Sequence, residues 1–267
     1  MESLALISSL VSTLASPVTP SPHDGSDNWY QPATNSHWQI QLQGAPNTGY
    51  PVDVFILDLF DTSSTIIQDI HASGRHVICY FSAGSYEDWR EDKHRFLPSD
   101  KGRNLDGWPG ERWIDIRSQN VRAIMSDRIA LAAEKGCDGI DPDNVDGYTN
   151  NTGFALSGRD QLDYHRFLAA LAHEHGLAIS LKNNLEQTHE LVSITDFAIN
   201  ESCHQWQECD QLAPFIDAGK AVFHIDYVYA NDGDARSLFC QSMREQSFRS
   251  LTLPVALDDS YRFSCDE

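Results

Sequence analysis

Short apolar runs alternate with longer amphipathic stretches along most of this 267-residue chain. The apolar runs are rich in β-branched and aromatic residues and are bounded by polar or glycine-containing segments, as is typical of buried β-strands. We predict eight strands, over residues 38–42, 54–59, 76–81, 113–116, 139–141, 178–181, 197–199 and 221–225.

Amphipathic helices are predicted between several of these strands, over residues 63–73, 119–135, 161–175 and 212–218. Each is followed by a glycine, which favours the left-handed conformation that turns the chain towards the next strand. These glycines are Gly74, Gly136, Gly176 and Gly219. The repeat of helix, glycine, strand and polar loop predicts parallel strands joined by crossover helices. Eight such strands predict an α/β fold of the (β/α)8 TIM-barrel type in a single domain.

The first 28 residues differ from the rest of the chain. Residues 1–16 contain an apolar run that is diluted with serines and ends in small residues, which predicts a signal peptide. The run is too short for a membrane span, and the start of the chain carries Glu2 but no Lys or Arg. Residues 17–28, with three prolines and a glycine, predict a flexible linker. Residues 29–267 then form the folded domain, and we expect a secreted protein.

The formal net charge is −20, from 39 acidic and 19 basic side chains. Such a surface repels nucleic acids and anionic membranes and attracts cations, so we expect neither nucleic acid nor membrane as a partner. Two interpretations remain open: the acidity keeps a secreted protein soluble, or the substrate is cationic. We expect a monomer, because no apolar surface signature for association is visible in the sequence.

Six cysteines are compatible with an oxidising compartment. We predict disulfides between Cys203 and Cys209 and between Cys240 and Cys265. Cys79 lies in an apolar strand and Cys137 just before one, which predicts buried thiols. No CxxC motif and no Cys/His spacing typical of zinc occurs, so we predict no metal site and no cofactor.

Polar side chains recur where the predicted strands end. An isolated residue of this kind would be a turn or cap residue, but clusters on nearly every strand indicate an active site, because catalysis in barrels takes place at the carboxyl ends of the strands. The candidates for substrate binding are Asp58, Tyr80, Ser82, Asp141, Asn144, Lys182, Asn184, Asp226 and Tyr227.

Two carboxylates at strand ends are the minimum equipment for hydrolysing a glycosidic bond. Asp143 and Glu201 are our candidates, with Asp143 as nucleophile and Glu201 as general acid/base. Asp141 precedes a proline and points inward or orients Asp143, whereas Asp146 is interpreted as a cap or turn residue. Lys182 is a counter-charge or, less favoured because the surrounding acids would keep it protonated, a Schiff-base lysine.

The chain resembles glycoside hydrolase family 114, the endo-α-1,4-polygalactosaminidases. The resemblance lies in residues 79–87, 113–117, 136–147, 181–183 and 200–201, and it extends from about Trp38 to Tyr227. It implies a (β/α)8 barrel that cleaves α-1,4-linked galactosamine within a polysaccharide. It also implies that an aspartate of the Asp-Pro-Asp-Asn motif and the glutamate of the Asn-Glu motif are catalytic, which here are Asp143 and Glu201.

We therefore expect a secreted endo-acting hydrolase of a cationic galactosamine polymer such as galactosaminogalactan, with a role in biofilm polysaccharide degradation and a retaining mechanism. The alternatives are a hydrolase of another α-linked galactose-type glycan and a non-catalytic glycan-binding barrel. Sequons occur at Asn150 and Asn200. Because Asn200 adjoins Glu201, we predict that it is unmodified and that Asn150 is the acceptor if either is used.

Overall fold

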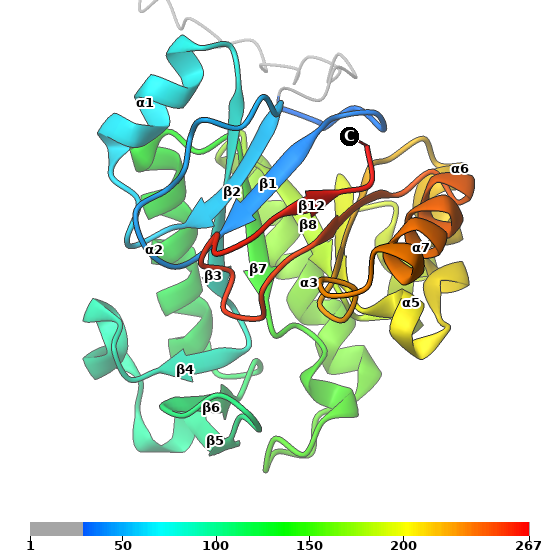
Figure 1. Cartoon of the computed structure of the whole chain (residues 1–267). Coiled ribbons are helices and arrows are strands. Elements are labelled where there is room, and N and C mark those ends of the chain that lie inside the picture. The colour runs from blue at the N-terminus through cyan, green and yellow to red at the C-terminus, as the bar shows by residue number, and fades with distance from the viewer. Residues whose placement is uncertain (1–28, 267) are drawn as a thin grey trace, which may run out of the picture.

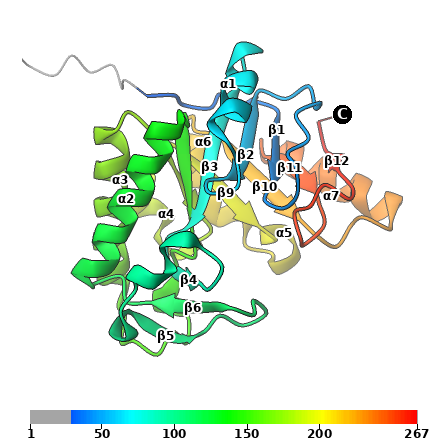
Figure 2. The same ribbon diagram turned by 90° about the vertical axis from the view of Figure 1, so that its left-hand side faces the viewer.

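The computed structural model describes residues 29–266, so the predicted signal peptide and linker lie outside the described residues. A nine-stranded sheet forms the centre of the domain (Figures 1 and 2). Its order is β1 (Trp38–Gln41), β2 (Val54–Asp58), β3 (His76–Ser82), β7 (Gly139–Asp143), β8 (Ala178–Lys182), β9 (Phe197–Glu201), β10 (Val222–Asp226), β11 (Arg249–Thr252) and β12 (Phe263–Ser264). The first eight pair in parallel, and β12 runs antiparallel to β11.

The sheet curls into a TIM-barrel-like structure, which confirms the predicted fold class. The segment before β12 spans the gap to β1, where the Arg262 guanidinium donates to Gln39 Oε1 at 2.9 Å and to the Trp38 carbonyl at 3.2 Å. The backbone amide of Leu42 donates to the Leu257 carbonyl at 2.9 Å in the same region. Side chains and loop backbone therefore link the two edges, while no ladder between β12 and β1 is found in residues 29–266.

Helices cover the outside of the curled sheet (Figures 1 and 2). They are α1 (Ser64–Ala72), α2 (Gln119–Lys135), α3 (Gly158–Glu174), α4 (Thr188–Leu191), α5 (Cys203–Trp206), α6 (Ala213–Asp217) and α7 (Gly233–Glu245). The four predicted helices are present, and the four glycines that follow them all have positive φ. Helix α3 begins earlier than predicted because Ser157 and Asp160 form a capping box at its start. Helices α4, α5 and α7 were not predicted.

The period-two alternation of the strands sorts their side chains between two cores. Ile56, Ile78 and Phe223 belong to a cluster inside the barrel. Phe55 and Val77 belong to a cluster that packs under α1, α2 and α3 on the outside. Both faces are apolar, as expected of a parallel sheet covered by helices. This alternation also decides which polar residues at the strand ends face the barrel mouth.

One predicted barrel strand was wrong. Residues 113–116 overlap β6 (Glu111–Ile114), which pairs antiparallel with β4 (Ser85–Glu87) and β5 (Lys101–Asn104) in a separate small sheet. This sheet belongs to the insertion after β3 and lies beyond the carboxyl ends of the barrel strands (Figures 1 and 2). The barrel strand that the sequence analysis did not predict is β11. Apolar, β-branched residues suit a half-buried insertion as well as a barrel, so the pattern alone could not separate the two.

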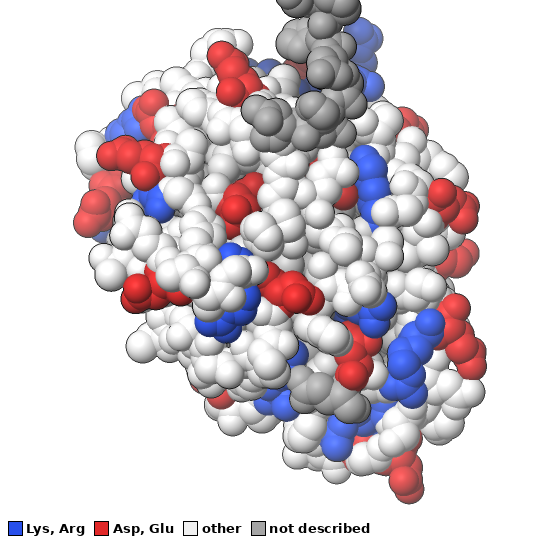
Figure 3. Space-filling model, turned by 90° about the horizontal axis from the view of Figure 1, so that it is seen from above, with Lys and Arg blue, Asp and Glu red and all other residues white. Residues whose placement is uncertain are grey.

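The short connections contain five 3-10 helices. They are η1 (Glu91–Arg95), η2 (Pro98–Asp100), η3 (Gly147–Thr149), η4 (Leu185–Gln187) and η5 (Cys209–Leu212). The face at the opposite end of the molecule from the insertion is shown in Figure 3, with acidic and basic side chains interspersed among uncharged ones. That face therefore displays no continuous field of one sign.

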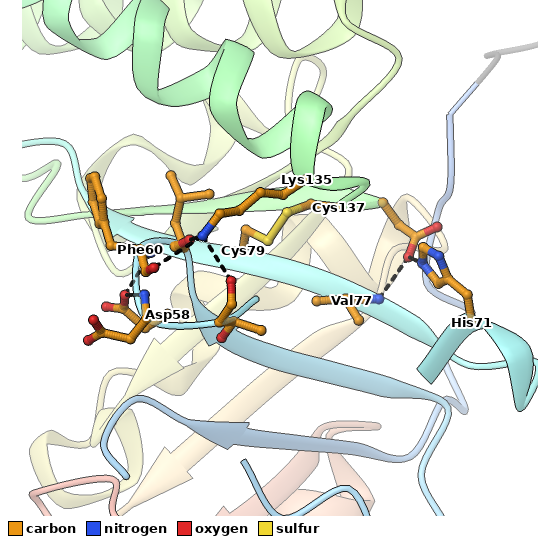
Figure 4. Close-up of a disulfide and its surroundings, with 11 residues drawn as sticks. Asp58, Phe60, His71, Val77, Cys79, Lys135 and Cys137 are labelled. Carbon is orange, nitrogen blue, oxygen red and sulfur yellow. Dashed lines mark hydrogen bonds and ion pairs between the residues drawn. A yellow bond between two sulfur atoms is a disulfide. The ribbon is translucent and has the colours of Figure 1, made fainter. Parts of the chain in front are cut away.

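The structure contains three disulfides. The predicted Cys203–Cys209 and Cys240–Cys265 pairs are confirmed. The prediction of free thiols at Cys79 and Cys137 was wrong, because these two cysteines are bonded to each other (Figure 4). The error follows from the misplaced strand: once residues 113–116 leave the barrel, β3 and β7 become neighbours, and their cysteines come within a Cα–Cα distance of 5.9 Å.

Lys135 anchors the end of α2 beside this disulfide (Figure 4). Its ammonium group donates to the backbone carbonyls of Leu59, Phe60 and Thr62 at 2.6, 3.1 and 2.8 Å. The helix then ends at Gly136, whose φ of 89° is left-handed. These contacts fix α2 against the loop after β2 and set the path of the chain into β7.

Candidate active site

The candidate site lies in a cavity of about 210 Å³ at the carboxyl ends of the barrel strands. Barrel enzymes build their active sites at this end. The side chains that reach it from the strands follow the inward-facing positions of the sheet. The cavity is lined by Leu42, Tyr80, Leu105, Trp108, Glu111, Asp143, Asn144, Val145, Asp146, Lys182, Asn183, Glu201, Tyr227, Val255 and Leu257.

Lys182 occupies the middle of the site and contacts both predicted catalytic carboxylates. Its Nζ lies 3.3 Å from Asp143 Oδ1 and 3.6 Å from Glu201 Oε2. Its side chain is only 2% exposed. Although burial alone would lower the pKa of this ammonium, Asp143, Glu201 and Asp141 hold it well above its usual range. Lys182 is therefore a permanent cation, which fits the counter-charge interpretation and not an amine that forms a Schiff base.

Two tyrosine hydroxyls complete the environment of the carboxylates. Tyr80 donates to Asp143 Oδ2 at 2.8 Å, and Tyr227 donates to Glu201 Oε1. Burial, together with the neighbouring carboxylate, raises the pKa of each hydroxyl well above its usual range. Both hydroxyls thus stay protonated and act as donors. Each carboxylate receives one tyrosine hydroxyl and one contact from Lys182, so the two are held by matching sets of partners.

Each central residue is followed by one in the left-handed conformation. Asn144 after Asp143 has a φ of 59°, and Asn183 after Lys182 has a φ of 50°. Ser202, after Glu201, has a φ of 64°. This conformation ends the strand and turns the chain away, so the preceding side chain stands at the mouth of the barrel. Such backbone is costly for residues other than glycine and clusters at functional sites, with asparagine among the best tolerated.

The loop after β3 supports Asp143 through its backbone. The amides of Ala83 and Gly84 donate to the Asp143 carbonyl at 2.9 and 3.0 Å. A Cβ at Gly84 would lie 1.6 Å from the Asn144 carbonyl oxygen, so only glycine fits there. Asn183 supports the other carboxylate, because its Oδ1 accepts from the Glu201 amide at 2.9 Å and its Nδ2 donates to Glu201 Oε2 at 3.3 Å.

Two further aspartates surround the pair. Asp141 is fully buried below the cavity, where the Ser180 hydroxyl donates to its Oδ1 at 2.5 Å. Burial raises the pKa of Asp141 to about 6, despite the opposing effects of Lys182 and Ser180. Asp146 lines the cavity itself, and burial followed by the charge of Asp143 raises its pKa to about 6. Asp146 occupies the N-cap position of η3 and lies in a turn, as predicted, although its side chain makes no cap hydrogen bond.

Four of the nine predicted binding residues line the cavity, namely Tyr80, Asn144, Lys182 and Tyr227. The other five do not line it: Asp58, Ser82, Asp141, Asn184 and Asp226.

Asp58 and Asp226 have structural partners instead. Asp58 forms a two-pronged ion pair with Arg90, with nitrogen–oxygen distances of 3.0 and 2.7 Å. Asp226 falls on the outward-facing positions of β10, where its carboxylate accepts from the Val228 amide at 3.1 Å. The strand alternation therefore explains the position of Asp226, whereas Asp58 shares the inward face of β2 with Ile56 and is held by Arg90 instead.

Ser82 and Asn184 also lie outside the cavity. The Ser82 hydroxyl is buried and accepts from Asn144 Nδ2 at 2.9 Å, so it orients a cavity residue without reaching the cavity. Asn184 lines an adjoining pocket of about 310 Å³ that shares Asp146, Asn183 and Glu201 with the main one.

The two sequons differ in accessibility. Asn200 is 1% exposed, and its Oδ1 accepts from the Cys203 amide, whereas Asn150 is exposed. This difference in burial supports the prediction that Asn150 is the acceptor if either sequon is used, which stays a prediction.

The insertion after β3 contributes cavity residues that do not lie at the ends of barrel strands and were not among the predicted site residues. Leu105, Trp108 and Glu111 form part of the cavity wall, although the insertion is not a barrel strand. The sequence did not indicate Glu111 as a site residue. It precedes the segment that was interpreted as a barrel strand, whereas the candidates were chosen from residues at the ends of strands.

One group of potential metal ligands occurs in the described part of the chain, formed by Cys203, Cys209 and His224. The two cysteines are bonded to each other in a disulfide, which removes their thiolates as ligands. The grouping therefore does not form a thiolate metal site.

The sequence profile of glycoside-hydrolase family GH114 matches residues 19–267. The chain belongs to this family. It is a glycoside hydrolase, and the carboxylate-lined cavity lies where a barrel hydrolase acts on its substrate. A comparison with curated proteins gives no match.

Two solved glycan-related structures share the fold of this chain. The chain is 39% identical to Aspergillus fumigatus Ega3, whose structure is a complex with galactosamine, with a TM-score of 0.84 over 88% of this chain and 97% of the other. The glycoside hydrolase domain of PelA from Pseudomonas aeruginosa shares the fold at 16% identity, with a TM-score of 0.67 over 84% of this chain and 96% of the other. Among the described helices of this GH114 protein, none combines the length and the apolar character that a membrane crossing requires.

Proposed function

We propose that this GH114 protein is a secreted endo-α-1,4-polygalactosaminidase whose catalytic residues are Asp143 and Glu201. The observation that carries the proposal is the pair of carboxylates on either side of the buried Lys182 ammonium. Two carboxylates in one cavity at a barrel mouth are the machinery of glycosidic bond hydrolysis. The galactosamine part rests on the family and on the likeness to Ega3, which was solved with that sugar.

The charge of the protein supports a cationic substrate. The chain carries a formal net charge of −20, and the cavity contains Glu111, Asp143, Asp146 and Glu201 against the single ammonium of Lys182. A polymer with free amines would be concentrated near such a surface and would bind less tightly as salt is added. Trp108 adds an aromatic surface for the apolar face of a sugar ring.

A retaining mechanism fits the spacing of the two carboxylates. Oxygens of Asp143 and Glu201 lie no more than about 7 Å apart, because both contact the same Lys182 nitrogen. This bound includes the separation of about 5–5.5 Å found in retaining enzymes and only the lower edge of the 6.5–9.5 Å found in inverting enzymes.

In the first step, Asp143 attacks the anomeric carbon and forms a glycosyl ester while the bond from that carbon to the glycosidic oxygen breaks. Glu201 gives its proton to this oxygen, which leaves as the hydroxyl of the departing sugar chain. In the second step, Glu201 takes a proton from water, whose oxygen then displaces Asp143 and releases the sugar. Tyr80 donates to Asp143 at 2.8 Å and so stabilises it as a leaving carboxylate.

The test of the function is reducing-end release from partly deacetylated α-1,4-linked polygalactosamine, with product sizes determined by mass spectrometry. Oligosaccharides of several lengths at early times are the expected result, as for an endo-acting enzyme. Binding of the polymer without cleavage would favour a non-catalytic glycan-binding barrel. If the protein cleaved only other α-linked galactose-type glycans, the proposed substrate would be wrong. Proton NMR of the first product distinguishes retention from inversion at the anomeric carbon.

Secretion, a role in biofilm polysaccharide turnover and a monomeric state remain part of the proposal. Three disulfides within the described residues support an oxidising compartment. Light scattering of the purified protein tests the monomer. Detection of a mature protein in the culture medium of the producing cells tests secretion, and retention inside the cell would contradict it.

A further inference from the structure

Glu111 is the one buried carboxyl of the catalytic cavity that neither the mechanism nor the sequence analysis uses. It lies on β6 of the insertion and lines the same cavity as Asp143. Its side chain is buried, since only 8% of the residue is exposed. A carboxyl in such a position is costly unless it is protonated or paired with a cation.

The neighbouring Glu87 shows how this protein normally pairs a buried carboxylate. Glu87 and Glu111 are direct register partners on β4 and β6, so their side chains lie on the same face of the small sheet. Glu87 contacts Arg90 at 2.8 Å and Arg128 at 3.6 Å, and both arginines are buried with it. Its charge is therefore matched within the protein.

Glu111 has no such partner. The Ser85 hydroxyl donates to its Oε2 at 2.5 Å, but Oε1 has no hydrogen-bond partner and no cation lies within ion-pair distance among the described residues. Burial raises the pKa of Glu111 to about 7, and the charges of Glu87 and Asp143 contribute to the rise. The protein thus keeps a carboxyl in the catalytic cavity with no cation paired to it among the described residues.

We propose that Glu111 binds the ammonium group of a galactosamine unit in the catalytic cavity and thereby selects deacetylated substrate. This inference rests on the proposed function. The nitrogen of a 2-amino sugar is carried by the carbon next to the anomeric carbon, so its partner must lie near the nucleophile. Glu111 meets this condition, because its residue lines the same cavity as Asp143.

An ammonium group would supply the missing cation and occupy the unused oxygen. An N-acetyl group carries no charge and is bulkier, and the cavity wall beside Glu111 is formed by Leu105 and Trp108. An acetylated sugar would therefore leave Glu111 unpaired. Asp146 is the other unassigned carboxyl of the cavity, but more of its residue is exposed than of Glu111. The unmatched, buried Glu111 is the better candidate.

The test compares two α-1,4-linked galactosamine oligosaccharides of equal length, one fully deacetylated and one fully N-acetylated. KM and kcat, or the inhibition constant where an oligosaccharide is not cleaved, are measured for wild type and Glu111→Gln. The amide keeps the size of the side chain and can still bond Ser85. Glu174→Gln is the matched control, because it removes the same charge from an exposed position at the far end of α3.

Glu111→Gln should raise KM for the deacetylated oligosaccharide roughly 10- to 100-fold, the loss expected when a hydrogen bond to a charged group is removed. The constant for the acetylated oligosaccharide should change less than about threefold, as should both constants in the control. Glu111→Asp, which keeps the charge but shortens the side chain, should give a smaller loss and provides a second variant if the amide impairs folding.

Three results would overturn the assignment. An unchanged preference in Glu111→Gln would show that the ammonium binds elsewhere. A loss of preference in Asp146→Asn, with Glu111→Gln behaving as wild type, would transfer the role to Asp146. A wild type that cleaves neither oligosaccharide and does not release reducing ends from the polymer would remove the proposed function itself, and with it the ammonium as ligand.

Discussion

Replacing Lys182 with methionine removes the only ammonium of the cavity while keeping the length of the side chain. The Lys182 Nζ lies 3.3 and 3.6 Å from oxygens of Asp143 and Glu201. At an effective dielectric constant of ~20, each contact corresponds to an attraction of about 5 kcal/mol. Burying the ammonium costs several kcal/mol in lost hydration, so the net stabilisation is smaller than the sum of the two attractions.

Deleting one partner of a buried ion pair leaves the other charges unmatched, and this costs about 3–5 kcal/mol. We therefore expect the free energy of unfolding of Lys182→Met to fall by that amount. For a domain of this size the melting temperature should fall by roughly 6–20 °C, at about 2–4 °C per kcal/mol. The rate constant kcat should fall at least ~100-fold, because the ammonium holds both carboxylates in place for the reaction.

Denaturant unfolding, calorimetry and reducing-end release measure these effects. Lys93→Met is the matched control, because it removes the same charge from an exposed side chain and should change stability by no more than about 0.5 kcal/mol. If Lys182→Met unfolded like the control, the proposed charge balance would be wrong. If it were destabilised but fully active, Lys182 would support the fold without taking part in the reaction.

Three further predictions concern stability. Burial raises the pKa of Asp141 to about 6, so folding favours the protonated form of this carboxyl. The stability that results is lost as the pH rises from about 4 to 6. The substitution Asp141→Asn should remove this loss, so the variant should gain up to about 3 kcal/mol in the free energy of unfolding relative to wild type between pH 4 and pH 7. Burial lowers the pKa of His165 to about 4 and that of His224 to about 3. The free energy of unfolding should therefore fall by about 1.4 kcal/mol per pH unit for each group as the pH drops below 6.5. In denaturant titrations, His224→Gln should show a shallower fall than wild type. Replacing Cys79 and Cys137 together with alanine opens a disulfide that spans 58 residues and should lower the free energy of unfolding by about 2–4 kcal/mol, whereas an unchanged melting curve would show that the bond does not form.

The strand pattern correctly predicted the barrel strands that carry the centre of the candidate site. β3, β7, β8 and β9 lie at or within a residue or two of their predicted positions, and their ends carry Tyr80, Asp143, Lys182 and Glu201. These residues meet because parallel strands bring their carboxyl ends to one side of a sheet. The composition of the barrel strands therefore located the centre of the candidate site before any contact was known.

The errors arose where the chain leaves this repeat. The segment 113–116 is as apolar as a barrel strand, but it returns from an insertion and pairs antiparallel. That single error separated β3 from β7, which hid the Cys79–Cys137 disulfide, and it also placed Glu111 away from the site. Asp226 lies outside the cavity for another reason, because a strand end alone does not reveal which way a side chain faces.

The cavity residues Leu105, Val255 and Leu257 could not have been found from local patterns. Val255 and Leu257 line the cavity from a loop that follows β11, and Leu105 and Trp108 line it from the β5–β6 connection. Their contacts with the site depend on packing between segments that are distant in sequence. Local periodicity carries no information about such packing.

The most direct test of the account compares reducing-end release from partly deacetylated polygalactosamine by wild type, Asp143→Asn and Glu201→Gln, with folding verified by circular dichroism. Both variants keep the shape of the side chain and remove only the carboxylate. We predict that wild type releases oligosaccharides and that each folded variant loses activity by several orders of magnitude. A folded variant that retained near wild-type kcat would contradict the assignment of Asp143 and Glu201 as the catalytic pair.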